Sequence, residues 1–465
     1  MRFSHQFLCL PFYWLPMCLS ERRSIKERVL NCLNQNESIL LKGSASSFIV
    51  QSFGALLALF LQVTLARVLG VESYGTYTYV WAWINIAVLV GTFGFKTASV
   101  KFIAQYESLA QSRRLAQYLR FSRRVILLVS VGTGLTVVVS GYILAGSDDE
   151  LLSSLLVAAI LVLILTRVRV AAAELRGLQH VVQALVPEKI LYPLCFAGLV
   201  LLASWQGIGL DAPAAFGINI CASLFVLGVL LQRIRTEMPT ALRGVSPRPA
   251  LAARKKRWIV TARDMLMIGG FNVILFRADV LMIGMLISPT ESGLYNVASR
   301  IATVLVFVLS SVNAIMAPLA SKLYSQKKFD ELQRVVDLAA RVSFVFSGIV
   351  AVAIFLVRFE LLGIFGDEFR ASASALWPLL VGQVVNSFSG PAIMLLNMTD
   401  RQGVSARILG VTAIMNVILN FGFIQMVGFQ GAAFATMITM VLWNAVAVYC
   451  VRREIDIRST ALPRV

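Results

Sequence analysis

The sequence carries little charge for its length. Only 14% of its 465 residues are Asp, Glu, Lys or Arg, whereas an ordinary soluble protein has about 25%. Hydrophobic residues make up 58%, and the mean hydropathy is +0.78. They form long blocks instead of the alternating patterns that face a soluble core. A soluble enzyme, a disordered chain and a secreted disulfide scaffold are therefore excluded, and a polytopic membrane protein remains.

The motifs of common active sites are also absent. There are two histidines, His5 and His180, and six cysteines without CxxC spacing, so neither a zinc site nor a redox motif is predicted. The sequence contains no GxxxxGK[ST], HExxH or GxSxG, the patterns typical of ATP hydrolysis, metalloproteases and serine hydrolases. We expect no catalytic residue, no metal and no cofactor, and the chain is not predicted to be an enzyme.

Twelve apolar blocks approach the length of about 20 residues that a helix needs to cross a bilayer. Within lipid, the backbone polar groups must be satisfied inside the segment, which selects helices. The fold class is therefore an all-α polytopic membrane protein. The predicted spans are 44–66, 78–98, 125–145, 151–166, 186–205, 213–232, 265–287, 294–319, 342–358, 374–397, 406–427 and 431–451.

The basic residues predict which side of the membrane each gap faces. The net charge is +18, and 36 of the 42 Lys and Arg residues lie in the gaps on one side if the chain starts there. The opposite gaps hold only Arg67, Arg358 and Arg370. Because cytoplasmic loops collect Lys and Arg, both termini are predicted to be cytoplasmic. This distribution belongs to membrane topology, and no nucleic-acid partner is expected.

The spans divide into two sets of six. The predicted organisation is a cytoplasmic or interfacial segment 1–43, a six-helix lobe 44–232, a basic linker 233–263, a second six-helix lobe 264–451 and a cytoplasmic tail 452–465. The linker is rich in Pro and basic residues, which indicates flexibility. It is also positioned to touch anionic lipid headgroups, although its charge is equally explained by topology alone.

The two lobes resemble each other in sequence. Gly75 and Tyr77 follow the first span, and Gly293 and Tyr295 follow the seventh at an offset of 218 residues. Basic pairs after the second and eighth spans, 113–114 and 327–328, have an offset of 214. These matches favour a duplicated six-helix unit, related by an axis along the membrane normal with a transport path between the copies. Chance agreement of short topology signals is the alternative.

The first residues admit more than one interpretation. Residues 7–19 are apolar but too short to span and are interrupted by Pro11 and Pro16. They fit a signal peptide, although a small-residue cleavage site is missing. Translation starting at Met17 is the other interpretation.

Ionisable residues inside spans are costly and usually face a cavity or a partner. Arg277 and Asp279 lie in the seventh span, too close in sequence to pair with each other, and Arg300 in the eighth span is the expected partner of Asp279. A cationic cavity wall for an anionic headgroup is predicted, with Arg277 and Arg300 as its main charges. The alternative is a buried ion pair that only fixes helix packing. Lys96 is a further candidate, or it extends to the interface.

Neutral polar residues within the spans are weaker candidates. Asn272 and Asn313 are predicted to line a sugar-binding cavity, although such amides more often join helices. Glu188 and Lys189 are expected at the cytoplasmic interface. The aromatic cluster Tyr74, Tyr77, Tyr79, Trp81 and Trp83 is expected to form an outer interface belt.

The order of several short motifs resembles a known family, the polysaccharide-biosynthesis flippases of the multidrug/oligosaccharidyl-lipid/polysaccharide (MOP) exporter superfamily, which includes O-antigen-type flippases. The resemblance covers roughly residues 38–452 and is specific to the superfamily, not to a substrate. It rests on Leu65-Ala66-Arg67-Val68-Leu69-Gly70 with Tyr74-Gly75-Thr76-Tyr77, Gly94 and Lys96, Arg176-Gly177-Leu178-Gln179, Asp279-Val280-Leu281-Met282-Ile283-Gly284, and Gly293-Leu294-Tyr295-Asn296-Val297-Ala298.

The resemblance implies two lobes around a cavity that opens alternately to each side of the bacterial inner membrane. The implied substrate is a polyprenyl-pyrophosphate-linked oligosaccharide, an O-antigen or exopolysaccharide unit, moved to the outer leaflet without ATP. Asp279 becomes the candidate for ion coupling, and membrane lipids and a polysaccharide polymerase become implied partners. Two rival functions remain: a cation-coupled multidrug transporter of the same superfamily, and a membrane glycan polymerase or ligase.

Overall fold

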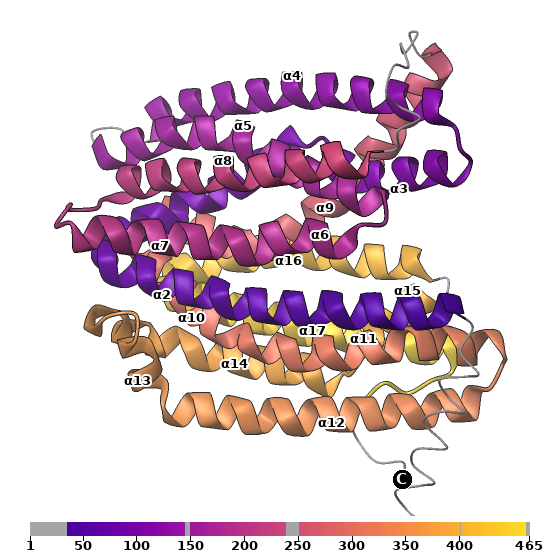
Figure 1. Ribbon diagram of the computed structural model, residues 1–465. Coiled ribbons are helices and arrows are strands. Elements are labelled where there is room, and N and C mark those ends of the chain that lie inside the picture. Colours follow the sequence, from indigo (N-terminus) through magenta and orange to yellow (C-terminus); the bar gives the residue numbers. More distant parts are fainter. Residues whose placement is uncertain (1–34, 145–148, 239–250, 400, 462–465) are drawn as a thin grey trace, which may run out of the picture.

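The computed structural model describes residues 35–144, 149–238, 251–399 and 401–461. Over these ranges the chain is helical and contains no strand, which confirms the predicted all-α class. Most of the long helices run roughly parallel to one another (Figure 1). The unusual apolar stretch 7–19 and the choice of start at Met17 lie outside the described residues.

The helices follow one another with short connections. The first half of the chain contains α2 (Gln35–Gly91), α3 (Phe95–Ser108), α4 (Ser112–Leu144), α5 (Asp149–Gly177), α6 (Val181–Val186), the π-helix η1 (Pro187–Leu191), α7 (Tyr192–Trp205) and α8 (Ala212–Glu237). The second half contains α9 (Ala252–Leu286), α10 (Pro289–Ala302), α11 (Val304–Ser325), α12 (Phe329–Leu356), α13 (Arg358–Gly363), the 3-10 helix η3 (Asp367–Ser372), α14 (Ala373–Phe388), α15 (Ala392–Met398), α16 (Gln402–Val427) and α17 (Phe429–Ile455).

All twelve predicted spans are mainly helical. In the described part of the chain, eight helices are long and apolar enough to cross a membrane, or nine if the bent pair Asp367–Phe388 and Ala392–Met398 counts as one span. One of them, Ile49–Ser108, has 60 residues and would be about 90 Å long if straight. Since the hydrocarbon core is about 30 Å thick, this stretch holds more than one crossing. The total of twelve remains a prediction.

A turn at Gly70 divides α2 into two antiparallel segments. Gly70 has φ 74° and ψ 175° inside this helix, a conformation that glycine adopts without steric cost. The Tyr74 hydroxyl donates a hydrogen bond to Gln62 Oε1 at 2.8 Å. Residues twelve apart on a straight helix are separated by about 18 Å, so the chain must reverse between them.

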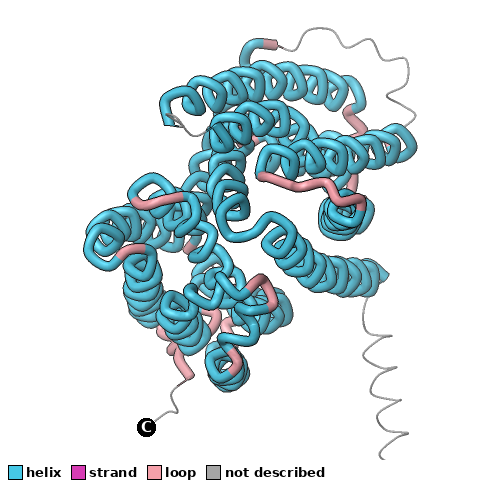
Figure 2. The backbone as a smooth tube through the Cα atoms, turned by 90° about the vertical axis from the view of Figure 1, so that its left-hand side faces the viewer, coloured by secondary structure: helices cyan, strands magenta, loops and turns pink. Residues whose placement is uncertain are grey.

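The helices form two groups that follow the order of the sequence (Figures 1 and 2). In one group α5 packs against α2, α4 and α8, and in the other α17 packs against α14 and α16. α2 and α10 pack against each other where the groups meet. The exact lobe limits 44–232 and 264–451 stay predictions.

The predicted linker 233–263 is helical at both ends. α8 continues to Glu237 and α9 begins at Ala252, while residues 239–250 lie outside the described chain. The start of α9 is anchored by the buried indole of Trp258, whose Nε1 donates a hydrogen bond to the Tyr106 hydroxyl at 2.9 Å. The first turns of α9 are thereby fixed to the first group of helices.

A close backbone contact supports the same junction. Gly94, at φ 73°, precedes α3, and a Cβ atom there would collide with the carbonyl oxygen of Ala262 in α9. Glycine is required at this position both by its conformation and by the approach of the neighbouring backbone.

The outward faces of the peripheral helices are apolar. On α4 and α12, side chains such as Leu128, Leu135, Phe346 and Ile349 are more than half exposed. A soluble monomer rarely exposes such continuous apolar surface, whereas lipid accommodates it. The chain is a multi-pass membrane protein.

Candidate functional site

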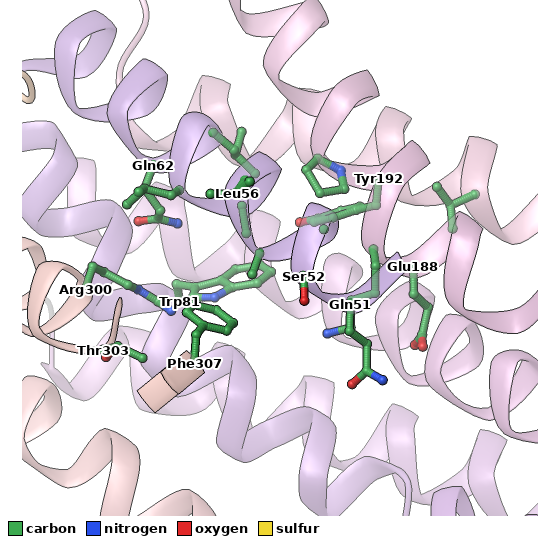
Figure 3. Close-up of a pocket in the computed structure, with 18 of the residues that line it drawn as sticks. Gln51, Ser52, Leu56, Gln62, Trp81, Glu188, Tyr192, Arg300, Thr303 and Phe307 are labelled. Carbon is green, nitrogen blue, oxygen red and sulfur yellow. The ribbon is translucent and has the colours of Figure 1, made fainter. Parts of the chain in front are cut away.

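A cavity of about 720 Å³ lies where the two groups of helices meet (Figure 3). α2 supplies much of its wall, first between Gln51 and Gln62 and again after the Gly70 turn. α5, η1, α7 and α8 complete the side formed by the first half, and α10 and α11 contribute Arg300 and Phe307 from the second half. Its volume falls in the range of about 300–1,000 Å³ that is usual for ligand sites.

The aromatic residues of α2 belong to the core and not to an interface belt. Tyr74, Tyr77 and Tyr79 are at most 3% exposed, so the predicted outer belt is wrong for them. The Tyr77 ring stacks on Phe216 with centroids 4.7 Å apart. The reversal at Gly70 brings Tyr77 and Trp81 back to the cavity beside Gln62, a placement that depends on the turn.

Among the described residues, the cavity wall carries three cations, Arg169, Lys189 and Arg300, and one acid, Glu188. Arg300 and Glu188 lie at opposite ends of the cavity in Figure 3. Among the described residues, Arg300 has no carboxylate partner. A guanidinium without a counter-ion next to a cavity favours an anionic ligand.

A π-helix positions Glu188 and Lys189. η1 begins at Pro187, directly after α6, and π-helical turns often occur at functional sites. Gly54 on α2 lets this turn approach, because a Cβ at Gly54 would lie 2.7 Å from Lys189 Cβ. Both side chains thus reach the cavity wall, whereas the sequence predicted them at the interface.

Asp279 is held by neutral groups and not by Arg300. Its Oδ2 accepts hydrogen bonds from the Tyr295 hydroxyl at 2.6 Å and the Thr436 hydroxyl at 2.7 Å. Its Oδ1 accepts one from Asn420 Nδ2 at 2.6 Å. The predicted ion pair with Arg300 is therefore wrong, because α10 presents Tyr295 to the carboxylate and Arg300 to the cavity.

Arg277 lies beside the cationic region but not on the cavity wall. Its charge is close enough to those of Arg300 and Arg169 to interact with them. Within the described residues it has no ion-pair partner. It therefore adds positive potential near the cavity without contacting its space.

Two of the remaining predicted residues, Lys96 and Asn313, do not line the cavity. Lys96 is exposed and lines a second hollow of about 360 Å³ with Thr97, Val100, Lys101 and Arg176. Asn313 is half-buried on α11, with its Oδ1 unbonded in the described part of the chain. The side chain of Asn272 lies outside what the structure describes.

Sequence reasoning missed Arg169 and Lys189. The predicted span 151–166 ends before Arg169, and Lys189 is predicted at the cytoplasmic interface, yet α5 continues through Arg169 to Gly177. The position of Lys189 follows from the π-helical turn, for which the sequence offers only Pro187 as a signal. Tertiary packing, not a local motif, brings these residues together.

One end of the cavity is closed by contacts between the two halves. Gly75 and Gly293 touch: a Cβ on Gly293 would lie 2.7 Å from Gly75 Cα. Arg67 Nε donates to the carbonyl oxygen of Ile364 at 2.6 Å, and Asn296 Nδ2 donates to the Tyr74 hydroxyl at 3.2 Å. We call this the outer end, because the charge distribution predicts that it faces outward.

The Gly75–Gly293 contact also bears on the repeat. These are the two glycines matched by the offset of 218 residues. Where two copies are related by a two-fold axis, a residue on the axis contacts its own counterpart. The contact is thus the geometry expected of a duplicated unit, and it gives the matched glycines a physical reason.

Comparison with known proteins identifies the same family. The family model described as "Polysaccharide biosynthesis protein" matches residues 40–324, and the MatE model matches residues 269–421. The "Probable flippase AglR" of Haloferax volcanii is 24% identical over 62% of this chain and 59% of its own length, so the match spans about three fifths of that relative. The "Probable low-salt glycan biosynthesis flippase Agl15" of the same organism is 25% identical over 86% of this chain and 81% of its own.

Solved structures share the fold. An inward-facing multidrug resistance MATE family transporter of the MOP superfamily has a TM-score of 0.71 at 14% identity, covering 88% of this chain and 98% of its own. The lipid II flippase MurJ in an inward closed conformation has a TM-score of 0.66 at 13% identity, covering 87% of each chain. At these identities the likeness establishes the fold alone.

Proposed function

Because the chain belongs to the polysaccharide biosynthesis protein family, we propose that it is a flippase that moves a lipid-linked oligosaccharide from the inner to the outer leaflet of a cytoplasmic membrane. The two relatives named as flippases support a transporter and not a catalytic enzyme. The predicted setting is the bacterial inner membrane with an O-antigen or exopolysaccharide unit as cargo, although these relatives are archaeal.

The observation that carries the proposal is the charge of the cavity. Arg169, Lys189 and Arg300 outnumber Glu188 on its wall, and Arg277 adds a fourth positive charge nearby. A polyprenyl diphosphate carries the opposite charge and needs such groups to enter a region of low dielectric. Gln62, Tyr77, Trp81 and the other polar or aromatic wall residues suit a sugar, while the lipid tail remains in the bilayer.

We propose that transport proceeds by alternating access, which the contacts at the outer end support. In this conformation the contacts of Gly75, Gly293 and Arg67 join the two halves there. Release to the outer leaflet requires these contacts to separate and the opposite end to close. Two stable packings of rigid helix groups are the usual basis of such a transition.

We assign ion coupling to Asp279. Its carboxylate accepts hydrogen bonds from Asn420 Nδ2 and the Thr436 hydroxyl, and Asn420 Nδ2 also donates to Asn416 Oδ1. Polar groups of α9, α16 and α17 therefore meet at Asp279. Asn420 Oδ1 is buried without a partner among the described residues. A proton or a small cation bound to this group changes the charge where three helices meet, which biases one packing over the other.

A cation-coupled multidrug transporter is the second candidate, favoured by the MatE match to residues 269–421. Its substrates are often cations, for which a wall with three cations and one acid is unfavourable. We therefore rank it below the flippase.

Reconstitution distinguishes the two. The full chain in proteoliposomes is given a lipid-linked oligosaccharide with a fluorescent headgroup, and an impermeant quencher reports its appearance in the outer leaflet. We expect movement above that of empty liposomes and no movement of ethidium. Movement of ethidium without movement of the glycolipid would assign the chain to multidrug transport.

A further inference from the structure

Four cationic side chains gather around one carboxylate, that of Glu188, near the cytoplasmic end of the first helix group. Glu188 Oε2 lies 3.5 Å from Arg176 Nη1, and its Oε1 lies 3.8 Å from Arg169 Nη1. The charges of Lys96 and Lys189 act on the same group. Four cations therefore share one acid, and the cluster carries an excess of about three positive charges.

Glu188 stands between two hollows. With Arg169 and Lys189 it lines the large cavity, while its other ion-pair partner, Arg176, lines the second hollow. That hollow contains two further cations, Lys96 and Lys101, both exposed and without an ion-pair partner among the described residues. A continuous series of cations therefore leads from one hollow to the other past a single carboxylate.

The pairing of Glu188 is weak for a buried acid. Its side chain is 5% exposed, yet Oε1 makes no hydrogen bond within the described residues. Arginine and phosphate form hydrogen bonds of about 2.7–2.9 Å, shorter than both of these ion pairs. A phosphate reaching the arginines would therefore bind them more closely than Glu188 does.

The backbone at the second hollow also favours an anion. Lys96 and Thr97 belong to the first turn of the 14-residue helix α3, which no side chain of the described residues caps at Gly94. The dipole of a helix N-terminus attracts negative charge. Here it acts together with three cationic side chains, while the amides of Phe95 and Thr97 already donate to the carbonyl oxygens of Thr92 and Gly94.

We propose that Lys96, Lys101 and Arg176 form a cytoplasmic subsite for the diphosphate of the substrate, and that Glu188 is the internal counter-ion which this diphosphate displaces on its way into the large cavity. The inference rests on the proposed function and deepens it. The carboxylate balances part of the positive charge of the arginines when no substrate is present. After the headgroup has passed, it pairs with them again and favours release.

Equilibrium binding tests this without transport. The purified full chain in detergent is titrated with geranylgeranyl diphosphate, and again in nanodiscs with and without phosphatidylglycerol. Lys101→Gln and Arg176→Gln are expected to weaken diphosphate binding by about tenfold, the loss of one charge-assisted hydrogen bond. Lys322→Gln, which removes an exposed lysine at the end of α11, is the matched control and should bind as the wild type does.

The substitution Glu188→Gln distinguishes a role of Glu188 as a displaceable counter-ion from a purely structural role. Removing the competing acid is expected to tighten diphosphate binding severalfold. If Glu188 only holds the arginines in place, the same change weakens binding or leaves it unaltered, and the proposal fails. If the glutamine variant unfolds, Glu188→Asp serves instead, and an affinity for diphosphate no higher than that of the wild type contradicts the proposal.

The remaining outcomes are also decisive. Equal affinities for Lys101→Gln, Arg176→Gln and the control would overturn the subsite. Sensitivity of these two variants to phosphatidylglycerol but not to the diphosphate would assign the hollow to a membrane lipid headgroup and overturn its assignment to the substrate. Because no step depends on translocation, failure of the flippase assay leaves this measurement interpretable.

Discussion

At the scale of single residues, the charges divide into those that are paired and those that are left for a ligand. The Glu174 side chain is 1% exposed and forms ion pairs with two arginines, with nitrogen–oxygen distances of 2.6 Å to Arg123 and 3.1 Å to Arg167. Arg300, by contrast, faces the cavity without an ion-pair partner among the described residues. The first arrangement holds helices together, and the second is available to a substrate.

Arg300→Ala is expected to weaken binding of an isoprenoid diphosphate by about tenfold or more, because a charge-assisted contact is lost. Arg300→Lys should retain part of the affinity, since it keeps the charge but not the fork of donors. Isothermal titration of the purified protein measures both. Arg263→Ala, which removes an exposed arginine paired only with its neighbour Asp264, is the control, and equal losses in all three variants would contradict a specific role.

Asp279→Asn should uncouple transport from an ion gradient while the fold persists, since asparagine retains the size of the side chain but cannot bind a proton or balance a cation. The measurement is the rate of glycolipid movement with an imposed Na⁺ or proton gradient, compared with no gradient. Asp264→Asn, an exposed carboxylate at the cytoplasmic end, is the matched change. A variant that still responds fully to the gradient would remove Asp279 from the coupling.

Glu174→Gln should lower the unfolding temperature. Breaking a buried ion pair by removing one partner costs about 3–5 kcal/mol, and here two arginines lose their acid together. Thermal unfolding in detergent measures the change, with Glu331→Gln as a control because that carboxylate is exposed and pairs with Lys328 only at the surface. Similar unfolding temperatures for both variants would show that the Glu174 cluster contributes little.

At the scale of helices, small and polar side chains decide where elements meet. Ser347 and Ser387 share a hydrogen bond of 2.8 Å between α12 and α14, and the Tyr192 hydroxyl donates to Asn219 across α7 and α8 at 3.0 Å. In lipid, close approach at small residues and hydrogen bonds between helices replace the hydrophobic drive of water. The same rule applies to Gly75 and Gly293 at the outer end.

Gly75→Ala should disfavour the outward-closed conformation. A Cβ there would lie 2.6 Å from Thr290 Cα in α10, so the halves must separate. The measurement is labelling of a cysteine at Thr303, a cavity residue, by an impermeant maleimide added outside, in a background without native cysteines. Labelling should increase relative to Gly198→Ala, whose Cβ meets nothing within 4 Å; equal labelling of the two variants would mean that this contact does not control opening.

At the scale of the whole molecule, the sequence predicted the class and the arrangement better than the site. Long apolar blocks require helices in lipid, so α4, α5, α8, α12, α16 and α17 were predictable from hydropathy alone. The turn at Gly70 was suggested by a gap between spans and by a glycine. Asp279 and Arg300 could be identified from the sequence because an ionisable residue inside a span is costly and usually faces a cavity or a partner.

The predictions that were wrong concern contacts between distant parts of the chain. Whether Tyr77 faces lipid or Phe216 is decided by the packing of α8, and the partner of Asp279 is decided by α16 and α17. Lys189 reaches the cavity only because η1 is π-helical and Gly54 admits it. Composition and spacing carry no information about such contacts, since each requires two segments far apart in sequence.

The most direct test of a cationic cavity as the path of the headgroup is charge removal. In proteoliposomes, movement of a fluorescent lipid-linked oligosaccharide is compared between the wild type and a variant with Arg169, Lys189 and Arg300 all replaced by Gln. A second variant in which exposed Arg263, Lys322 and Lys328 are replaced by Gln controls for net charge. We predict that the cavity variant loses movement of the glycolipid while remaining folded and that the surface variant retains it; undiminished movement by a folded cavity variant would contradict the account.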